Sequence, residues 1–156
     1  MPQLAAPPEP RGSRSTATDT RVGWVAEVWV DPGWHATRDG GAPCPSAGPP
    51  AVVTLTARSV LVGRPSRSRG IRPEVDCADD PGVSRRQAQL ITDGSRWWVE
   101  DLRSANGTYV GSADGPLPTE PLPPGERREL GDGDQVYVGS WTRLALRPDD
   151  TAGHSG

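Results

Sequence analysis

The sequence predicts an all-β fold, a sandwich of ten or so short strands. Glycine (19) and proline (18) together make up about a quarter of the 156 residues, which favours a turn-rich β domain over a helical one. Short runs of β-branched and aromatic residues recur between frequent turn signals, as they do in β-sandwiches. No segment has a convincing helical pattern, and the length suits one domain of ordinary size.

The expected strands follow one another along the chain with turns between them. We expect strands at 21–30, 51–57, 59–63, 86–92, 96–101, 107–110, 126–130, 134–139 and 141–147, with a short one just before Cys77. A long loop rich in proline and glycine, 31–50, separates the first two strands. The domain is therefore predicted to span 21–148. The tails 1–20 and 149–156 are predicted to be disordered because they contain few apolar residues.

The composition excludes several kinds of active site. All 17 basic residues are arginine, so a Schiff-base lysine and a P-loop lysine are both absent. Neither His35 nor His154 has a plausible catalytic neighbour in the sequence. The net charge of −3 gives no reason to expect general nucleic-acid binding. We therefore expect no enzymatic activity, no cofactor, no metal and no nucleic-acid partner.

The two cysteines and the hydropathy point to the cytoplasm. Cys44 and Cys77 form no CxxC pair, and Cys77 is expected to be a buried thiol. The first ten residues lack the apolar core of a signal peptide, and no run approaches the length of a membrane span. A cytoplasmic protein with free thiols is the resulting expectation.

Four segments place polar, donor-rich residues where a strand meets a loop. They are "VGRPSRSRGI" (62–71), "VSRRQAQL" (83–90), "EDLRSANGTYVG" (100–111) and "LGDGDQVYVG" (130–139). Their order and spacing resemble the forkhead-associated (FHA) domain family. Its pattern is Gly-Arg ending an early strand, then Ser-x-x-His, Asp-Leu-x-Ser-x-Asn-Gly-Thr and Leu-x-Asp-Gly-Asp. One such motif alone is weak, but four in order over 51–147 are a strong signal. The stretch 63–90 is similar to bacterial, especially actinobacterial, FHA proteins, in line with the lysine-free composition.

The resemblance implies an FHA-type sandwich of about eleven strands whose loops at one end bind phosphothreonine peptides. Such a domain is a non-catalytic module of serine/threonine kinase signalling, with a phosphothreonine protein as its partner. A phosphothreonine carries about −1.5 to −2 charges and three acceptor oxygens, which suits converging arginine and hydroxyl donors. The phosphopeptide-binding residues implied are Arg64, Ser84, Arg85, Ser104, Ala105 and Asn106. The residues implied to support the loops are Gly63, Gln87, Gly107 and Thr108.

Three positions depart from the family pattern. Gln87 stands where the family has the histidine that braces the binding loops, and a Gln amide can also donate and accept. Ala105 stands where Thr or Ser often helps to hold the phosphate, so only its backbone N–H is available. Gly82 stands where a charged residue could contact the third peptide residue after the phosphothreonine. These departures motivate the alternative of a degenerate FHA fold that binds partners without phosphate.

The arginine-rich region 64–86 and the N-terminal tail each allow more than one interpretation. The arginines between 64 and 86 form either a solvated face or a surface that guides an acidic phosphopeptide. Nucleic-acid binding through these arginines and an exposed Trp is a third reading, and Trp34 is the best candidate for an exposed contact. The tail "RSTATDT" (14–20) carries Thr16 with Asp19 three residues on. The hypothesis is that phosphorylated Thr16 docks on the domain's own site or on a neighbour's.

Overall fold

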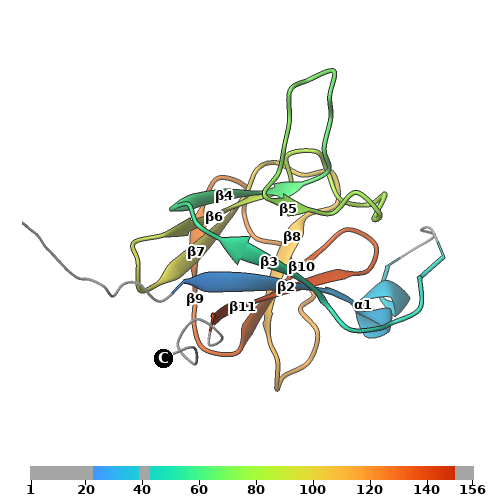
Figure 1. Cartoon of the computed structure of the whole chain (residues 1–156). Coiled ribbons are helices and arrows are strands. Elements are labelled where there is room, and N and C mark those ends of the chain that lie inside the picture. Colours follow the sequence, from blue (N-terminus) through green and yellow to red (C-terminus); the bar gives the residue numbers. More distant parts are fainter. Residues whose placement is uncertain (1–22, 39–42, 150–156) are drawn as a thin grey trace, which may run out of the picture.

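The computed structural model describes residues 23–38 and 43–149 (Figure 1). These residues contain ten strands, arranged as two sheets of five strands each. The predicted all-β sandwich is confirmed. The predicted disordered tails, 1–20 and all but the first residue of 149–156, lie outside the described residues, as does Thr16. The described helix is too short and too polar to cross a membrane.

The first sheet is antiparallel throughout. Its order is β3 (Ala51–Leu55), β2 (Trp24–Val30), β11 (Thr142–Pro148), β10 (Asp134–Val138) and β8 (Thr108–Ser112). The second sheet has the order β5 (Val75–Asp76), β4 (Ser59–Gly63), β6 (Ala88–Thr92), β7 (Trp97–Asp101) and β9 (Arg127–Leu130). In this sheet only β4 and β5 run parallel.

Strand periodicity places the core between the sheets. Side chains alternate between the two faces of a strand, so every second residue of β4 and β6 points inward. Val60 lies opposite Leu90 and Val62 lies opposite Ala88, and all four are buried. Residues from β10 and β11, such as Leu144, close this cluster from the other sheet. The register therefore follows from the alternating pattern that the sequence shows.

The predicted loop 31–50 begins with a short helix that the sequence analysis missed, α1 (Pro32–Ala36). Asp31 caps it, since its Oδ1 accepts a hydrogen bond from the Trp34 N–H (2.9 Å), and Pro32 occupies the first turn, where no N–H is needed. Five residues are too few to show helical periodicity in a sequence.

Trp34 was the best candidate among the tryptophans for an exposed contact, but it is buried. Its side chain is 0% exposed and packs against the rings of Tyr109 and Tyr137, with centroids 4.9 and 5.1 Å away. Its Nε1–H donates to the carbonyl of Gly139 (3.3 Å), and the Arg38 guanidinium covers the ring. Trp34 thus anchors α1 to the first sheet and offers no surface to a nucleic acid.

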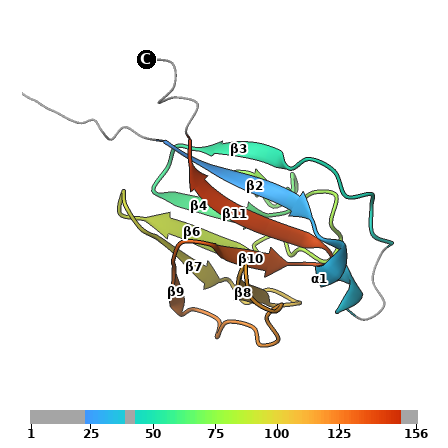
Figure 2. The ribbon, with the colours of Figure 1, turned by 90° about the horizontal axis from the view of Figure 1, so that it is seen from below.

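The sandwich has two distinct ends. The start of β2 and the end of β11 lie together at the basal end, where the Asp149 N–H donates to the carbonyl of Gly23 (2.9 Å). At the opposite, apical end lie α1, the β10–β11 turn and the loops that follow β4 and β7 (Figures 1 and 2). The donor-rich segments 62–71, 83–90 and 100–111 contribute loops to the apical end. The fourth segment, 130–139, starts at the basal end and reaches the apical end at the β10–β11 turn.

Both cysteines are free thiols, and Cys77 is buried, as expected. Burial raises the pKa of Cys77 to about 12, with further contributions from the carboxylates of Asp80 and Asp76. Its thiol therefore stays protonated at neutral pH.

Candidate phosphopeptide-binding site

The first part of the site is the Gly-Arg pair at the apical end of β4. Gly63 lies directly under the backbone of the following loop, and a Cβ atom built on it would stand 1.9 Å from the carbonyl oxygen of Arg85. This close approach lets the Arg64 N–H donate to the Ser84 carbonyl (3.2 Å). The Arg64 Nε–H donates to the carbonyl of Val83 (2.6 Å), and the terminal guanidinium nitrogens have no acceptor among the described residues. Arg64 is thus held in place through Nε, while its terminal N–H groups bind no acceptor among the described residues.

Ser84 joins this loop to the loop after β7. Its Oγ accepts a hydrogen bond from the Ala105 N–H (2.9 Å), while its hydroxyl hydrogen has no acceptor in the part of the chain that the structure describes. Arg85 beside it is exposed. The Asn106 Nδ2 donates to the carbonyl of Gly82 (2.9 Å), which ties the two loops together at a second point. Ser84 and Asn106 therefore lie on adjoining loops, as the resemblance implies.

Gln87 connects three segments from a fully buried position. Its side-chain Oε1 accepts from the Ser84 N–H (2.8 Å), and its Nε2 donates both to the Gly107 carbonyl (2.9 Å) and to the Thr108 Oγ1 (3.0 Å). Its backbone pairs with Val62 of β4. The amide uses its acceptor and both donors, so no polar atom of this 0% exposed side chain is left without a partner. A glutamine thus links the loops at the position where the family has histidine.

The loop after β7 is organised around a buried carboxylate. Asp101 is 2% exposed and accepts hydrogen bonds from the Ser104 N–H (3.2 Å), the Ser104 hydroxyl and the Thr108 hydroxyl (2.7 Å). The Ser104 Oγ in turn accepts from the Gly107 N–H (3.0 Å). Gly107 has a φ of 87°, which a residue with a side chain rarely adopts. These bonds fix the turn that presents Asn106 to solvent.

One known protein family matches the part of the chain that contains all of these loops. Residues 60–139, half of the chain, match the family model described as "FHA domain".

The chain belongs to the FHA domain family.

Several curated proteins are similar to this FHA domain. The glycogen accumulation regulator GarA of Mycolicibacterium smegmatis is 32% identical over 99 residues, which are 61% of this chain and 56% of GarA. FhaB of Mycobacterium tuberculosis is 41% identical over 63 residues, 40% of this chain and 37% of FhaB. The oxoglutarate dehydrogenase inhibitor of Corynebacterium diphtheriae is 32% identical over 111 residues, 68% of this chain and 71% of the inhibitor. The chain thus spans about half or less of the length of GarA and FhaB.

Solved structures share the fold. The solution structure of an Arabidopsis thaliana FHA domain superposes with a TM-score of 0.57 at 22% identity, over 88% of this chain and 94% of that domain. Full-length yeast Pml1p gives a TM-score of 0.57 at 16% identity, over 85% of this chain and 86% of Pml1p. At these identities the likeness establishes the FHA fold.

Two predicted binding residues point into this FHA domain's own loops. The Ser104 hydroxyl and the Ala105 N–H were expected to face the phosphopeptide. The hydroxyl instead bridges Asp101 and Gly107, and the N–H is bound to the Ser84 Oγ. Ser104 and Ala105 therefore position the residues beside them in this structure.

Sequence reasoning missed a second buried carboxylate, Asp80. Its side chain is only 1% exposed. Its oxygens accept from the N–H groups of Gly82, Ser140 and Trp141 (2.8, 2.9 and 3.0 Å) and from the Thr142 hydroxyl (2.7 Å). The sequence "DPG" (80–82) does indicate an Asp that caps a turn, but the contacts with residues 140–142 arise only in the folded chain.

The structure also shows two features that the sequence does not indicate, a close contact at Gly82 and a left-handed backbone at Arg103. A Cβ on Gly82 would stand 2.5 Å from the Oγ and 2.7 Å from the backbone nitrogen of Ser140, so no larger residue fits there without a shift. Arg103 is exposed and adopts a φ of 59°, the left-handed region that costs a residue with a side chain roughly 1–2 kcal/mol. Arg64, Arg85 and Arg103 form no ion pair within the described residues, so their charges are available to an anionic ligand.

Proposed function

We propose that this chain is a phosphothreonine-peptide-binding module of serine/threonine kinase signalling, without catalytic activity, that acts in the cytoplasm. The observation that carries the proposal is the arrangement of Arg64 and Ser84. Arg64 is fixed through Nε, and within residues 23–38 and 43–149 neither its terminal nitrogens nor the hydrogen of the neighbouring Ser84 hydroxyl has an acceptor. A phosphate dianion needs such converging, pre-positioned donors.

In this proposal each binding residue has a defined task. Arg64, Ser84 and Arg85 hold the phosphate oxygens. The Asn106 Oδ1, which has no donor among the described residues, accepts a hydrogen bond from the peptide backbone. Ser104 and Ala105 act through their neighbours, and Gly63, Gln87, Gly107 and Thr108 keep the loops in place. The hydrogen bonds of Gln87 to both loops favour a working site over the degenerate alternative.

The proposal is tested with a degenerate pool of labelled phosphothreonine peptides in a fluorescence-anisotropy titration. We expect binding that requires phosphothreonine, is weaker for the phosphoserine pool and is absent for the unphosphorylated pool. Arg64→Ala should weaken it by roughly 100-fold, because charge-assisted hydrogen bonds worth about 3 kcal/mol are lost.

The matched control is Arg58→Ala, an exposed arginine in the β3–β4 turn at the basal end, which should bind like the wild type. Binding that ignores phosphate and tolerates Arg64→Ala would contradict the proposal and support the degenerate fold. Binding of nucleic acid with a steep salt dependence and no need for Arg64 would support the third reading.

We further propose that phosphorylated Thr16 is a ligand of this site on a neighbouring molecule. Trp24 follows Thr16 by eight positions, and eight residue-to-residue steps reach at most about 29 Å when fully extended. The seven residues of β2 already cover roughly 23 Å, and the site lies on the other sheet, about 10 Å across. The chain's own site is therefore at the limit of reach, whereas a neighbour's site is not.

Sedimentation velocity checks this second proposal. The chain phosphorylated at Thr16 should self-associate, and both Arg64→Ala and an excess of phosphothreonine peptide should return it to the monomer. If phosphorylated and unmodified chains sediment alike and bind external phosphopeptide equally, Thr16 is not a ligand.

A further inference from the structure

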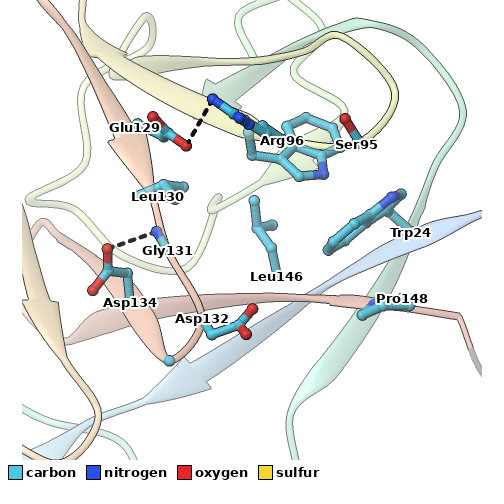
Figure 3. A pocket seen from close by; sticks show the side chains of 12 residues that line it. Trp24, Ser95, Arg96, Glu129, Leu130, Gly131, Asp132, Asp134, Leu146 and Pro148 are labelled. Carbon is cyan, nitrogen blue, oxygen red and sulfur yellow. Dashed lines mark hydrogen bonds and ion pairs between the residues drawn. The ribbon is translucent and has the colours of Figure 1, made fainter.

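A second concave site lies at the basal end, far from the apical loops. It is a hollow of about 310 Å³ between the β6–β7 turn, the β9–β10 turn and the beginning and end of β2 and β11. We call it the basal hollow. Figure 3 shows Trp24 and Pro148 on one side of it, the acidic residues Asp132 and Glu129 on the other, and Leu146 between them. Nothing in the proposed phosphothreonine function uses this site.

The apolar side of the basal hollow includes the half-buried ring of Trp24, with Trp97 packed behind it. Trp24 and Trp97 meet edge to face, with centroids 6.1 Å apart and planes inclined by 72°. Trp97 is buried behind Trp24, so the half-buried Trp24 ring is the indole surface open to a flat, rigid aliphatic ring. The prolyl ring is such a group, and aromatic grooves are the usual receptors of proline-rich segments in the polyproline II conformation.

The opposite side of the basal hollow is acidic. Glu129 forms a long, exposed ion pair with Arg96 (3.6 Å), and Asp134 accepts a hydrogen bond from the Gly131 N–H (2.8 Å). The Asp132 carboxylate is exposed and has no partner among the described residues. Three carboxylates against one guanidinium leave the hollow with a net negative charge. Its occupant should therefore carry a cation at one end.

One buried donor in the hollow also lacks an acceptor. Trp97 is 3% exposed, and its Nε1–H is the buried side-chain polar atom that has no hydrogen-bond partner in the part of the chain described. Leaving such a group unpaired is costly. A polyproline II segment makes no internal hydrogen bonds, so its carbonyl groups are free to accept one. The required occupant is thus proline-rich, positively charged at one end and rich in free carbonyl groups.

We propose that the chain's own segment Pro7–Arg11, within "APPEPR" (6–11), docks in the basal hollow. Polyproline II has three residues per turn, so Pro7 and Pro10 share the face that contacts the Trp24 ring. Arg11 follows the last proline and reaches the acidic side at Asp132. Glu9 lies on the third face and points away from the acids. Residues 12–23 connect the segment to β2, which begins in the hollow itself, and this tether of about 12 residues reaches roughly 40 Å when extended.

Two-dimensional ¹⁵N NMR of the full chain tests the proposal without any phosphopeptide. The tail variant Pro7→Ala/Pro10→Ala/Arg11→Gln should shift the indole N–H resonances of Trp24 and Trp97 and the amide resonances of 130–134. The matched tail variant Pro2→Ala/Arg14→Gln should leave them unchanged. A synthetic peptide of residues 5–13, titrated onto the first variant, should restore the wild-type positions. Asp132→Asn should raise the Kd of that peptide about threefold, in the range of one exposed ion pair, and Asp79→Asn at the apical end should not.

Two outcomes would overturn the proposal. One is that the domain resonances of the wild type and the first tail variant coincide, which would mean that the segment does not occupy the hollow. The other is that the differences disappear on roughly tenfold dilution, which would assign the hollow to the tail of a second copy. Because none of these measurements involves Arg64 or phosphate, failure here is distinguishable from failure of the proposed phosphothreonine function.

Discussion

Gly63→Ala is expected to lower the free energy of unfolding by at least about 3 kcal/mol and to abolish phosphothreonine-peptide binding. The added methyl carbon would stand 1.9 Å from the Arg85 carbonyl oxygen and 2.8 Å from its carbonyl carbon. Both atoms belong to the backbone, so no side-chain rotation relieves the overlap. The loop must move away from β4, and the hydrogen bonds of Arg64 to the carbonyls of Ser84 and Val83 are lost with that movement.

Urea denaturation followed by tryptophan fluorescence measures the stability, and the anisotropy titration measures binding. Gly48→Ala is the matched control, since a Cβ there meets no atom within 4 Å and the change should cost little. The anisotropy titration is carried out at a temperature where more than about nine-tenths of the Gly63→Ala protein is folded. A loss of affinity then reflects a change in the binding site and not unfolding. An unfolding free energy within about 0.5 kcal/mol of the wild type would show that the loop yields without cost.

Strand alternation explains how much of the fold was accessible from the sequence. Ala88 and Leu90 alternate with polar residues in the sequence and lie in the core, and most of the predicted strands match observed ones to within three residues at each end. Such periodicity is a local property of the chain, because each side chain's face depends only on its position in the strand. The glycines that mark turns are local signals in the same sense. The fold class could therefore be predicted before any contact was known.

Features that depend on distant residues could not be predicted in this way. Trp34 stands in a proline- and glycine-rich stretch that looks exposed, but its pocket is built from Tyr109 and Tyr137. Gly82 looked like a missing recognition residue, but it is the contact point with Ser140. In both cases the partner lies more than 50 residues away in the chain, and nothing in the local sequence identifies it.

The candidate site shows the same division. The motifs identified the loops, but not which atoms are already engaged within them. Ser104 and Ser84 are both hydroxyl residues at a loop, yet the Ser104 hydrogen is donated to Asp101, and the Ser84 hydrogen has no acceptor among the described residues. This difference assigns them different tasks in the proposed function. Donor availability is thus a property of the folded loop and is read from its hydrogen bonds.

Asp80→Asn is expected to destabilise the fold by about 3 kcal/mol although the two side chains have nearly the same shape. All four groups bound to the Asp80 carboxylate are donors: three backbone N–H groups and the Thr142 hydroxyl. An asparagine amide must turn its NH₂ toward some of them, whichever way it is flipped, so donor faces donor at a site that is 1% exposed. The loop 80–83 would then lose its connection to the β10–β11 turn.

The consequence extends to the proposed binding site through Gly82. This residue packs on Ser140 beside the carboxylate, and its carbonyl accepts the hydrogen bond from Asn106. We therefore expect Asp80→Asn to weaken phosphothreonine-peptide binding even under conditions where the chain is folded. Asp79→Asn is the matched control, because the neighbouring carboxylate is exposed and its loss should change neither quantity. If urea denaturation gives both variants the stability of the wild type, the four hydrogen bonds do not hold the loop. If Asp80→Asn is less stable but binds with wild-type affinity, the position of Asn106 does not depend on the β10–β11 turn.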